Sequence, residues 1–322
     1  MCGDRSCKCS DWNELREGMI TMKIIKVLFF LLISSAATIS AIYCELNSIP
    51  VGPMIGSLIA GISIPYLFPS IIDLTDNENW KSSQRKLKRA GILQKDTVIR
   101  ISFAYLFRIK VDGQYFLIHN TRTKKYQPVG GAYKFTKEES DYLSDNIPVE
   151  NDDRIPVDKI TKYDYRLLVK NEYLRKFVIR FNKTQCRENI PNLSREFVEE
   201  IFSTKILDRS AFGTLSYKYC GRHMTNIEYG SEFSHYELLL ADIIEVQLSD
   251  TQEQLFRNLM ETDCNKYRFA TADEIKSLGV KYRTNELEAD IANHTPKILS
   301  ENTDKLMRRN KHKKTITVQP SI

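Results

Sequence analysis

VLFFLLISSAATISAIYC, residues 27–44, is a run of 18 residues without a charged side chain. A second uncharged run, residues 46–72, follows at once and begins LNSIPVGPMIGSLIAG. The hydrocarbon core of a bilayer takes roughly twenty apolar helical residues to cross, so both runs are long enough. Because only residues 45–50 connect them, the sequence predicts an antiparallel α-helical transmembrane hairpin over residues 23–73.

Basic residues flank this hairpin on both sides and are absent from its turn. The flanking set is Arg16, Lys23, Lys26, Lys81, Arg85, Lys86, Lys88 and Arg89. By the positive-inside rule, both termini are expected in the cytoplasm and the turn outside. A cleaved signal peptide, with small residues near Ser40 and Ala41, is the alternative, and it leaves residues 49–72 as a single anchor.

Small residues recur at every fourth position of the second run, as Gly52, Gly56 and Ala60. Such a ridge lets two helix backbones approach closely in lipid. It fits packing within the hairpin or contact between subunits, and the sequence does not separate the two. Neither run holds an ionisable residue, so a single hairpin offers no ion pathway.

Composition divides the rest of the chain. The 322 residues carry a net charge of +6, and 42% are hydrophobic. We assign 1–22 to a cytoplasmic N-terminal segment, 74–92 to a basic juxtamembrane linker, 93–284 to a cytosolic domain with an insertion at 132–194, and 285–322 to a polar basic tail. The modest basic excess favours anionic lipid or a phosphate-bearing ligand over duplex nucleic acid. In the cytosol the seven cysteines are expected to be free thiols.

The cytosolic domain opens with strands. VIRISFAYLFRIK (98–110) is rich in β-branched and aromatic residues, Asp112-Gly113 marks a turn, and YFLIHN follows. Residues 136–165 are acidic and loop-like, 166–183 fit a strand or strand pair, and 235–248 fit an apolar strand. Thr271 and Glu274 have the spacing of a capping box at the start of a helix. This order predicts an α/β domain.

Three carboxylates, those of Glu196, Glu199 and Glu200, are expected on one face of a helix that begins after Ser194, and Arg195 lies beside them. Such an array can bind Mg²⁺, which neutralises a diphosphate and activates water. A solvated acidic helix face is the alternative.

A strand hairpin, a Gly-Gly turn and then this helix resemble the Nudix family, whose signature is G, five residues, E, seven residues and REUxEExGU, with U a bulky aliphatic residue. Gly131 matches the first glycine, and Arg195, Glu196, Glu199 and Glu200 match REUxEE with Phe197 at U. The resemblance implies an α/β sandwich in which the glutamates bind metal and Arg195 orients one of them. The chain departs from the signature in three places: about sixty residues separate Gly131 from Arg195, the earlier glutamate position is Arg187 with Glu188 adjacent, and Phe202 replaces the closing glycine.

Two membrane helices before a degenerate Nudix-like domain are similar to the membrane-Nudix effectors of bacterial CBASS antiphage systems, whose sensor belongs to the SMODS-associated Nudix group. The resemblance implies a multi-pass protein of the bacterial inner membrane that binds a cyclic oligonucleotide, forms homo-oligomers and disrupts the bilayer, causing abortive infection. It also implies a cognate nucleotidyltransferase as the functional partner and no required cofactor, with Mg²⁺ compatible with the site.

Ligand phosphates and bases call for basic and aromatic side chains. The expected binding residues are Arg122, Lys124, Lys125, Tyr126, Gly130, Gly131, Arg222 and His223. The alternative function is a membrane-tethered, Mg²⁺-dependent hydrolase of a nucleoside diphosphate derivative, in which Glu199 and Glu200 are catalytic. A structural or interaction protein is a third class.

Overall fold

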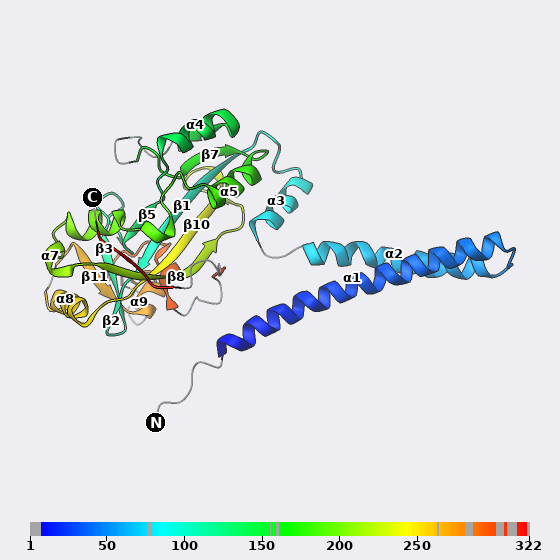
Figure 1. Ribbon diagram of the computed structural model, residues 1–322, viewed down its shortest axis with the longest axis horizontal. Coiled ribbons are helices and arrows are strands. Elements are labelled where there is room, and N and C mark those ends of the chain that lie inside the picture. The colour runs from blue at the N-terminus through cyan, green and yellow to red at the C-terminus, as the bar shows by residue number, and fades with distance from the viewer. Residues whose placement is uncertain are drawn as a thin grey trace, which may run out of the picture. The chain divides into compact units, whose positions relative to one another are not determined.

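The computed structural model describes residues 8–75, 79–152, 154, 156, 158, 161–262, 264–280, 286–300, 306, 307 and 314–320. The chain forms two units, residues 1–86 and 87–322. Figure 1 labels their elements.

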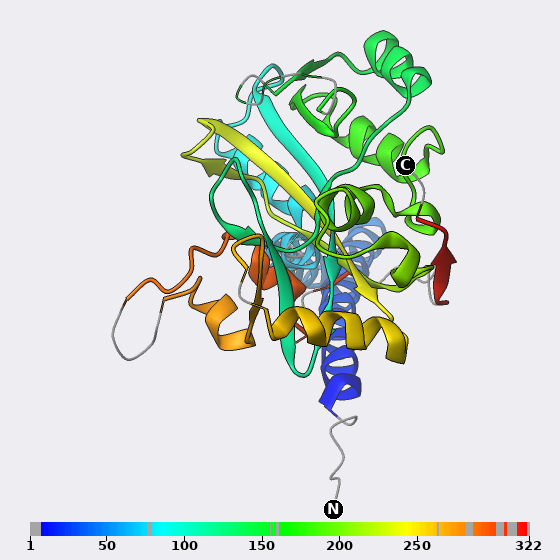
Figure 2. The ribbon, with the colours of Figure 1, turned by 90° about the vertical axis from the view of Figure 1, so that its left-hand side faces the viewer.

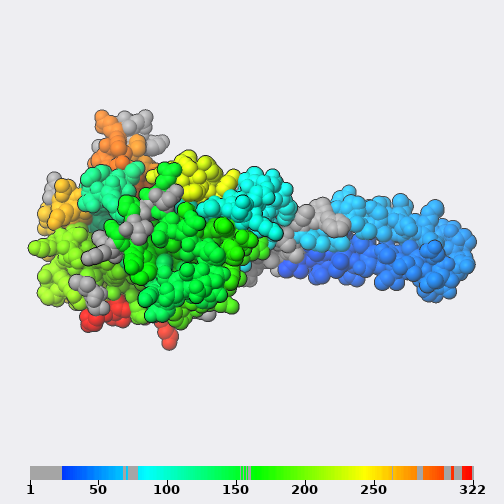
Figure 3. Space-filling model, turned by 90° about the horizontal axis from the view of Figure 1, so that it is seen from above, coloured from blue at the N-terminus to red at the C-terminus, as the bar shows by residue number. Residues whose placement is uncertain are grey.

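The first unit holds helices α1 (Lys8–Leu46) and α2 (Gly52–Thr75), and helix α3 (Trp80–Arg89) spans the boundary to the second. α1 and α2 run antiparallel and lie side by side in Figure 3, where both are blue. The hydroxyls of Ser34 and Ser63 are 2.8 Å apart, and the rings of Phe30 and Tyr66 stack at 5.8 Å. Because α1 begins at Lys8, residues 8–22 of the predicted N-terminal segment are helical, and residues 1–7 lie outside the described residues.

The two helices differ in the length of their apolar stretch, which decides whether each can span a membrane. Residues Ile24–Leu46 of α1 are long and apolar enough to cross a bilayer, whereas the apolar part of α2, Gly52–Leu67, is shorter. One apolar helix before the α/β domain is therefore confirmed, and a transmembrane hairpin of two spanning helices is not. The small residues of α2 do pack inside the chain: a Cβ on Gly56 would lie 2.7 Å from the Cβ of Ala41. Gly61 has no neighbour within 4 Å of such a Cβ.

The second unit contains two sheets. The strands are β1 (Val98–Arg108), β2 (Lys110–Val111), β3 (Gln114–His119), β4 (Tyr126–Gln127), β5 (Gly130–Ala132), β6 (Val149–Asn151), β7 (Arg166–Lys170), β8 (Leu215–Met224), β9 (Glu228–Gly230), β10 (His235–Val246), β11 (Tyr267–Ala270) and β12 (Ile316–Val318). The larger sheet has the order β12-β8-β10-β1-β7-β6, with β5 on β1 and β9 on β10; the smaller has the order β11-β3-β2, with β4 on β3. The predicted mixed α/β domain is confirmed.

β1 is the centre of the larger sheet because both of its faces are buried. One edge pairs in parallel with β10, and Figure 2 shows this cyan strand beside the yellow one. The other edge pairs with β7 over Val98–Ser102 and with β5 over Ala104–Leu106. Gly130 and Gly131 are therefore fixed at the middle of the domain.

The helices and helical turns of this unit are α4 (Lys137–Asn146), α5 (Leu174–Lys183), η1 (Ile190–Asn192), α6 (Arg195–Phe197), η2 (Val198–Phe202), α7 (Arg209–Phe212), α8 (Asp250–Met260), α9 (Ala272–Lys276) and η3 (Thr295–Ile298). The capping box that the sequence predicts at Thr271 and Glu274 is present. Ser194, in contrast, makes no side-chain cap at the start of α6.

The insertion at 132–194 contains two helices among its described residues. Residues 137–146 form α4, where a loop was expected, and 174–183 form α5, where a strand was expected. The buried residues of α5, Leu174, Phe177, Val178 and Phe181, recur at the spacing of one helix face. Glu139 of α4 is fully buried and binds Arg180 of α5 at 2.6 Å, so an ion pair joins the two helices.

The polar tail predicted for residues 285–322 begins too early, because its first part belongs to the folded domain. Ile291, Ile298 and Leu299 are fully buried in a core with Tyr115 and Leu117 of β3, and β12 pairs with β8. The guanidinium of Arg108, itself buried, donates to the carbonyl oxygens of Ile298 and Leu299. These contacts make 286–300 part of the domain, because its few apolar side chains fill the core although the segment is polar on average. The basic run at 308–313 lies outside the described residues.

Candidate nucleotide-binding site

The short helix that carries the three glutamates is anchored by its apolar residues. α6 continues without a break into η2, a turn of π-helix, and such turns are frequent at functional sites. Phe197, Val198 and Ile201 are buried, and the ring of Phe197 lies 5.6 Å from that of Phe107 on β1. This packing turns the remaining side of the helix, with its carboxylates, toward β5.

Two glycines of β5 let these carboxylates reach the strand backbone. The amide of Gly130 donates to Oε2 of Glu200 at 2.7 Å. A Cβ on Gly131 would lie 2.0 Å from Oε1 of Glu196. Any side chain at residue 131 would displace this carboxylate, so glycine allows the close approach of Glu196 to the strand.

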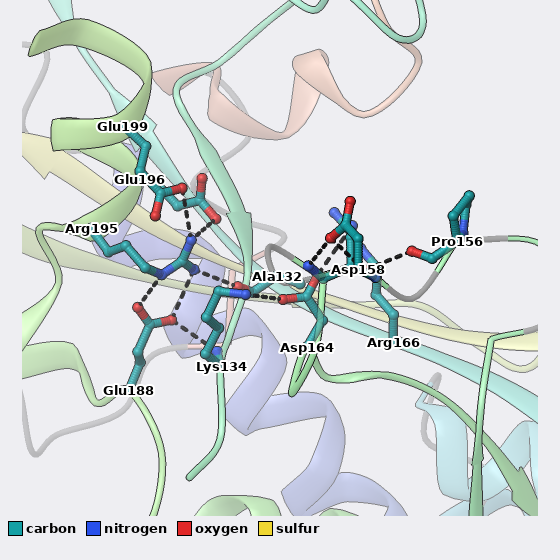
Figure 4. Close-up of polar contacts among 11 residues, drawn as sticks. Ala132, Lys134, Pro156, Asp158, Asp164, Arg166, Glu188, Arg195, Glu196 and Glu199 are labelled. Atoms are coloured by element: carbon teal, nitrogen blue, oxygen red, sulfur yellow. Dashed lines mark hydrogen bonds and ion pairs between the residues drawn. The ribbon is translucent and has the colours of Figure 1, made fainter. Parts of the chain in front are cut away.

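Arg195 is the centre of an ion cluster (Figure 4). Its guanidinium contacts Glu188 with Nε to Oε1 at 2.7 Å, and Glu196 with Nη1 to Oε1 at 2.7 Å. The same Nη1 lies 3.3 Å from Oε2 of Glu199, and Nη2 donates to the carbonyl oxygen of Ala132 at 3.0 Å. One planar cation thus contacts three carboxylates, offsets part of their negative charge and ties the helix to β5.

Burial shifts the pKa values of this cluster. Burial, with the charge of Glu196 second, raises the pKa of Glu200 well above its usual range. Burial also raises the pKa of Glu196, although the charge of Arg195 opposes the shift. For Arg195 burial acts to lower the pKa, but the hydrogen bonds to Glu188 and the charges of the neighbouring acidic groups together outweigh it, and the pKa rises. Arg195 therefore stays a cation, and Glu200 tends to hold its proton.

A pocket of about 550 Å³ lies against this helix. Its lining residues are Ile118, His119, Asn120, Thr121, Arg122, Glu199, Glu200, Thr204, Ile206, Asn265 and Lys266. The wall formed by β3, its following turn and the start of β11 carries Arg122 and Lys266, whereas the wall formed by η2 carries Glu199 and Glu200. A volume of this size suits a small organic ligand.

A family model for the SMODS-associated NUDIX domain matches residues 98–299 of the chain. The chain belongs to this family. The match runs from the first residue of β1 through η3, so it includes the insertion, the ion cluster and the pocket. No curated protein matches the chain.

The Nudix resemblance implies a metal ion at the three glutamates, whose contacts in this structure are those of an ion cluster. In the described residues no group of three His, Cys, Asp or Glu side chains converges as metal ligands. Glu196 is directed to Arg195, Glu200 accepts from the Gly130 amide, and Glu199 is 45% exposed. The metal set Glu196, Glu199 and Glu200 stays a prediction from the resemblance alone.

The pocket brings together some of the predicted binding residues. Arg122 lines it, together with Glu199 and Glu200. The backbone of Lys124 is in the left-handed region and its side chain is exposed, while Lys125 pairs with Asp290 at 3.2 Å. The hydroxyl of Tyr126 donates to the carbonyl oxygen of Asn265, so Tyr126 stands behind the pocket wall.

Arg222 and His223 lie apart from the pocket. Arg222 is 2% exposed and forms a two-point ion pair with Asp242, with Nε to Oδ1 and Nη2 to Oδ2 both 2.7 Å. The hydroxyls of Tyr133 and Tyr219 donate to the same carboxylate. Nε2 of His223 lies 3.1 Å from the carbonyl oxygen of Lys297. Both residues serve the core and the packing of η3.

Glu188 and most of the pocket wall were not predicted from the sequence. Glu188 sits one place after the position of the first signature glutamate, which was the available signal for it. Lys266 and Asn265 precede β11 and reach the pocket because β11 pairs with β3: the amide of His119 donates to the carbonyl oxygen of Lys266 at 2.8 Å. This pairing joins segments about 150 residues apart, and no local sequence pattern predicts it.

Proposed function

We propose that the protein is a ligand-gated membrane effector of bacterial antiphage defence of the CBASS type, with the α/β domain as its sensor. The ligand is a cyclic oligonucleotide made by a cognate nucleotidyltransferase. It binds the pocket beside η2, and binding favours an assembled homo-oligomer whose apolar helices disrupt the inner membrane. The family membership of residues 98–299 supports this reading.

The observation that carries the proposal is the ion cluster of Arg195. A hydrolase of this family type would hold metal at the glutamates, but here one guanidinium forms ion pairs with Glu188, Glu196 and Glu199. The pocket next to the cluster is intact, and its volume is about 550 Å³. A fold that keeps a pocket while its acidic residues are tied to an internal cation suits recognition better than catalysis.

The helices of the first unit suit the membrane step. Large apolar side chains are exposed on α1 (Leu28, Phe29, Leu32 and Ile39) and on α2 (Met54, Ile55, Leu58 and Ile62). Such a surface is costly in water and stable in lipid. We propose that both helices enter the bilayer, α2 at the short end of the range, and that both termini are cytoplasmic, as the basic flanks indicate.

Gating requires that the ligand bind the assembled state more tightly than the resting state. The test uses the full chain in lipid vesicles loaded with a self-quenched dye. A panel of cyclic di- and trinucleotides is added, and binding, dye release and nucleotide turnover are measured in the same samples. We expect one cyclic nucleotide to bind without turnover and to release the dye.

The test variant is Arg122→Gln, which removes a cation from the pocket. The control variant is Arg209→Gln, which removes an exposed cation at the start of α7. Only the first should weaken binding and dye release. Hydrolysis of a linear nucleoside diphosphate derivative, with no cyclic nucleotide bound, would replace the proposal with the membrane-tethered hydrolase.

A further inference from the structure

The two walls of the pocket carry opposite charges. Arg122, in the turn after β3, makes no ion pair with a carboxylate in the described part of the chain. Nζ of Lys266 donates to the carbonyl oxygen of Thr204 at 3.1 Å, a neutral partner that leaves its charge uncompensated. Two such cations on one wall favour a phosphate group at that end of a ligand.

Glu199 supplies the opposite charge. Its side chain is 45% exposed and lines the pocket, and among the described residues its one ion pair is that of Oε2 with Arg195 at 3.3 Å, so Oε1 has no ion-pair partner there. A carboxylate accepts hydrogen bonds through about four lone-pair sites and donates none when ionised. Whatever part of a ligand lies against Glu199 must therefore present N–H or O–H donors.

Among the common bases, the Watson–Crick edge of guanine has two adjacent donors, N1–H and the N2 amino group, which match the two oxygens of one carboxylate, since Oε2 keeps a second lone pair beside its contact with Arg195. Adenine and cytosine each place a ring nitrogen acceptor beside a single amino group, and uracil places two carbonyl oxygens beside its N–H. These acceptors would face the carboxylate and repel it. Asn120 and His119, also in the lining, are compatible with any base.

We propose that the pocket binds a guanine nucleotide unit, with Glu199 accepting from N1–H and N2–H of the base and with Arg122 and Lys266 holding its phosphate. This inference rests on the proposed function, which it narrows to cyclic oligonucleotides that contain guanine. The pocket volume of about 550 Å³ accommodates one nucleotide unit, so the rest of the ring is left for a second contact.

The experiment measures affinities of the full chain in lipid nanodiscs by calorimetry. The probes are the cyclic dinucleotides of guanosine, inosine and adenosine, and cyclic trinucleotides with and without one guanine. Inosine lacks the N2 amino group and is otherwise guanosine. We expect the order guanosine, inosine, adenosine, with about ten- to hundredfold between the first and the last.

Two substitutions test the two ends separately. Glu199→Gln should remove most of the preference for guanosine over adenosine, while Glu261→Gln, an exposed carboxylate at the end of α8, should change nothing. Arg122→Gln should weaken all the probes by a similar factor, should leave the base preference unchanged and should flatten the dependence of affinity on salt.

The outcomes separate this inference from the proposed function. If cyclic nucleotides bind but the preference is the same in Glu199→Gln as in the natural chain, or adenosine binds best, the base assignment is wrong and the sensor stands. If no probe binds and none releases dye from vesicles, the proposed function itself is overturned.

Discussion

Arg195 and Glu188 form a two-point ion pair, with Nε to Oε1 at 2.7 Å and Nη2 to Oε2 at 3.2 Å. Oε2 of Glu188 also accepts from the backbone amide of Lys134 at 2.9 Å. Glu188 thus fixes the arginine of the signature although it is one residue out of the family's register. The long insertion allows this offset, because the chain re-enters the site at residue 188 from α5 and is not fixed by a short loop from β5.

Glu188→Gln should destabilise the α/β domain by about 2 kcal/mol, since it leaves Arg195 short of one ionised partner in a partly buried place. The unfolding temperature of the full chain, followed by circular dichroism in detergent, measures the loss. Glu261→Gln is the matched control. An unchanged unfolding temperature for Glu188→Gln would show that the pair contributes nothing to stability.

Divalent ions should leave the unfolding temperature of the natural chain unchanged, because Glu196 and Glu199 already form ion pairs with Arg195 and Glu200 accepts from the Gly130 amide. Arg195→Met removes that cation and should cost about 3 kcal/mol in the presence of EDTA. Added Mg²⁺ or Mn²⁺ should then restore part of the loss, since the freed glutamates can become ligands. Saturable stabilisation of the natural chain by Mg²⁺ would contradict the assignment.

The sequence predicts those parts of the domain whose signals are local. β1 follows from its β-branched and aromatic residues, β10 from an apolar run, and α9 from the capping box at Thr271 and Glu274. The glutamates of α6 and η2 follow from a spacing that places them on one side of a helix. The direction of that side depends on Phe197 and its partners in the core, which only the fold determines.

The parts of the domain that were predicted wrongly depend on long-range contacts, or lie in segments whose average composition hides a few decisive residues. α5 has the aromatic and β-branched content of a strand, and only the spacing of Phe177 and Phe181 marks it as a helix. Residues 286–300 are polar on average, yet Ile291 and Ile298 fill the core. Arg222 looks like a ligand residue in a basic and aromatic stretch, but its partner Asp242 is 20 residues away on the next long strand.

Arg222→Met should unfold the domain rather than weaken ligand binding alone. It would leave Asp242 fully buried with two tyrosine hydroxyls and no cation, at a cost of about 3–5 kcal/mol. Although burial acts to raise the pKa of Asp242, Arg222 holds that pKa below its usual value. In Arg222→Met, therefore, Asp242 should take up a proton at a higher pH. Retained stability with selective loss of nucleotide binding would restore the predicted ligand role.

The domain should lose stability as the pH falls from about 6.5 to about 4, through His294. Burial, with the charges of Lys297 and Arg166, lowers the pKa of His294 to about 4. In the unfolded chain His294 binds a proton near its ordinary pKa of about 6.5. Below that pH His294 binds a proton in the unfolded state but not in the folded state. The free energy of unfolding therefore decreases until the pH reaches the pKa of His294 in the folded domain.

His294→Gln should flatten this pH dependence, and the same change at His235, the first residue of β10, controls for the loss of an imidazole. The measurement is the unfolding temperature of each variant between pH 7 and pH 4. An equal slope in the natural chain and in His294→Gln would assign the pH dependence to other groups.

The contact between Ser34 and Ser63 offers a direct test of how α1 and α2 sit in lipid. Their hydroxyl oxygens are 2.8 Å apart, and both side chains are buried between the helices. In a chain whose native cysteines are replaced by serine, Ser34→Cys with Ser63→Cys should form a disulfide within one chain when oxidised in vesicles.

A protease site introduced in the turn at residues 47–49 gives the readout, because the two fragments of a cleaved chain stay joined by the disulfide until it is reduced. The pair Ser34→Cys with Gly61→Cys is the control, because a Cβ on Gly61 has no neighbour within 4 Å. Dimers linked through the first pair, with no link inside a chain, would show that α2 packs against another subunit and that the antiparallel pair does not persist in the bilayer.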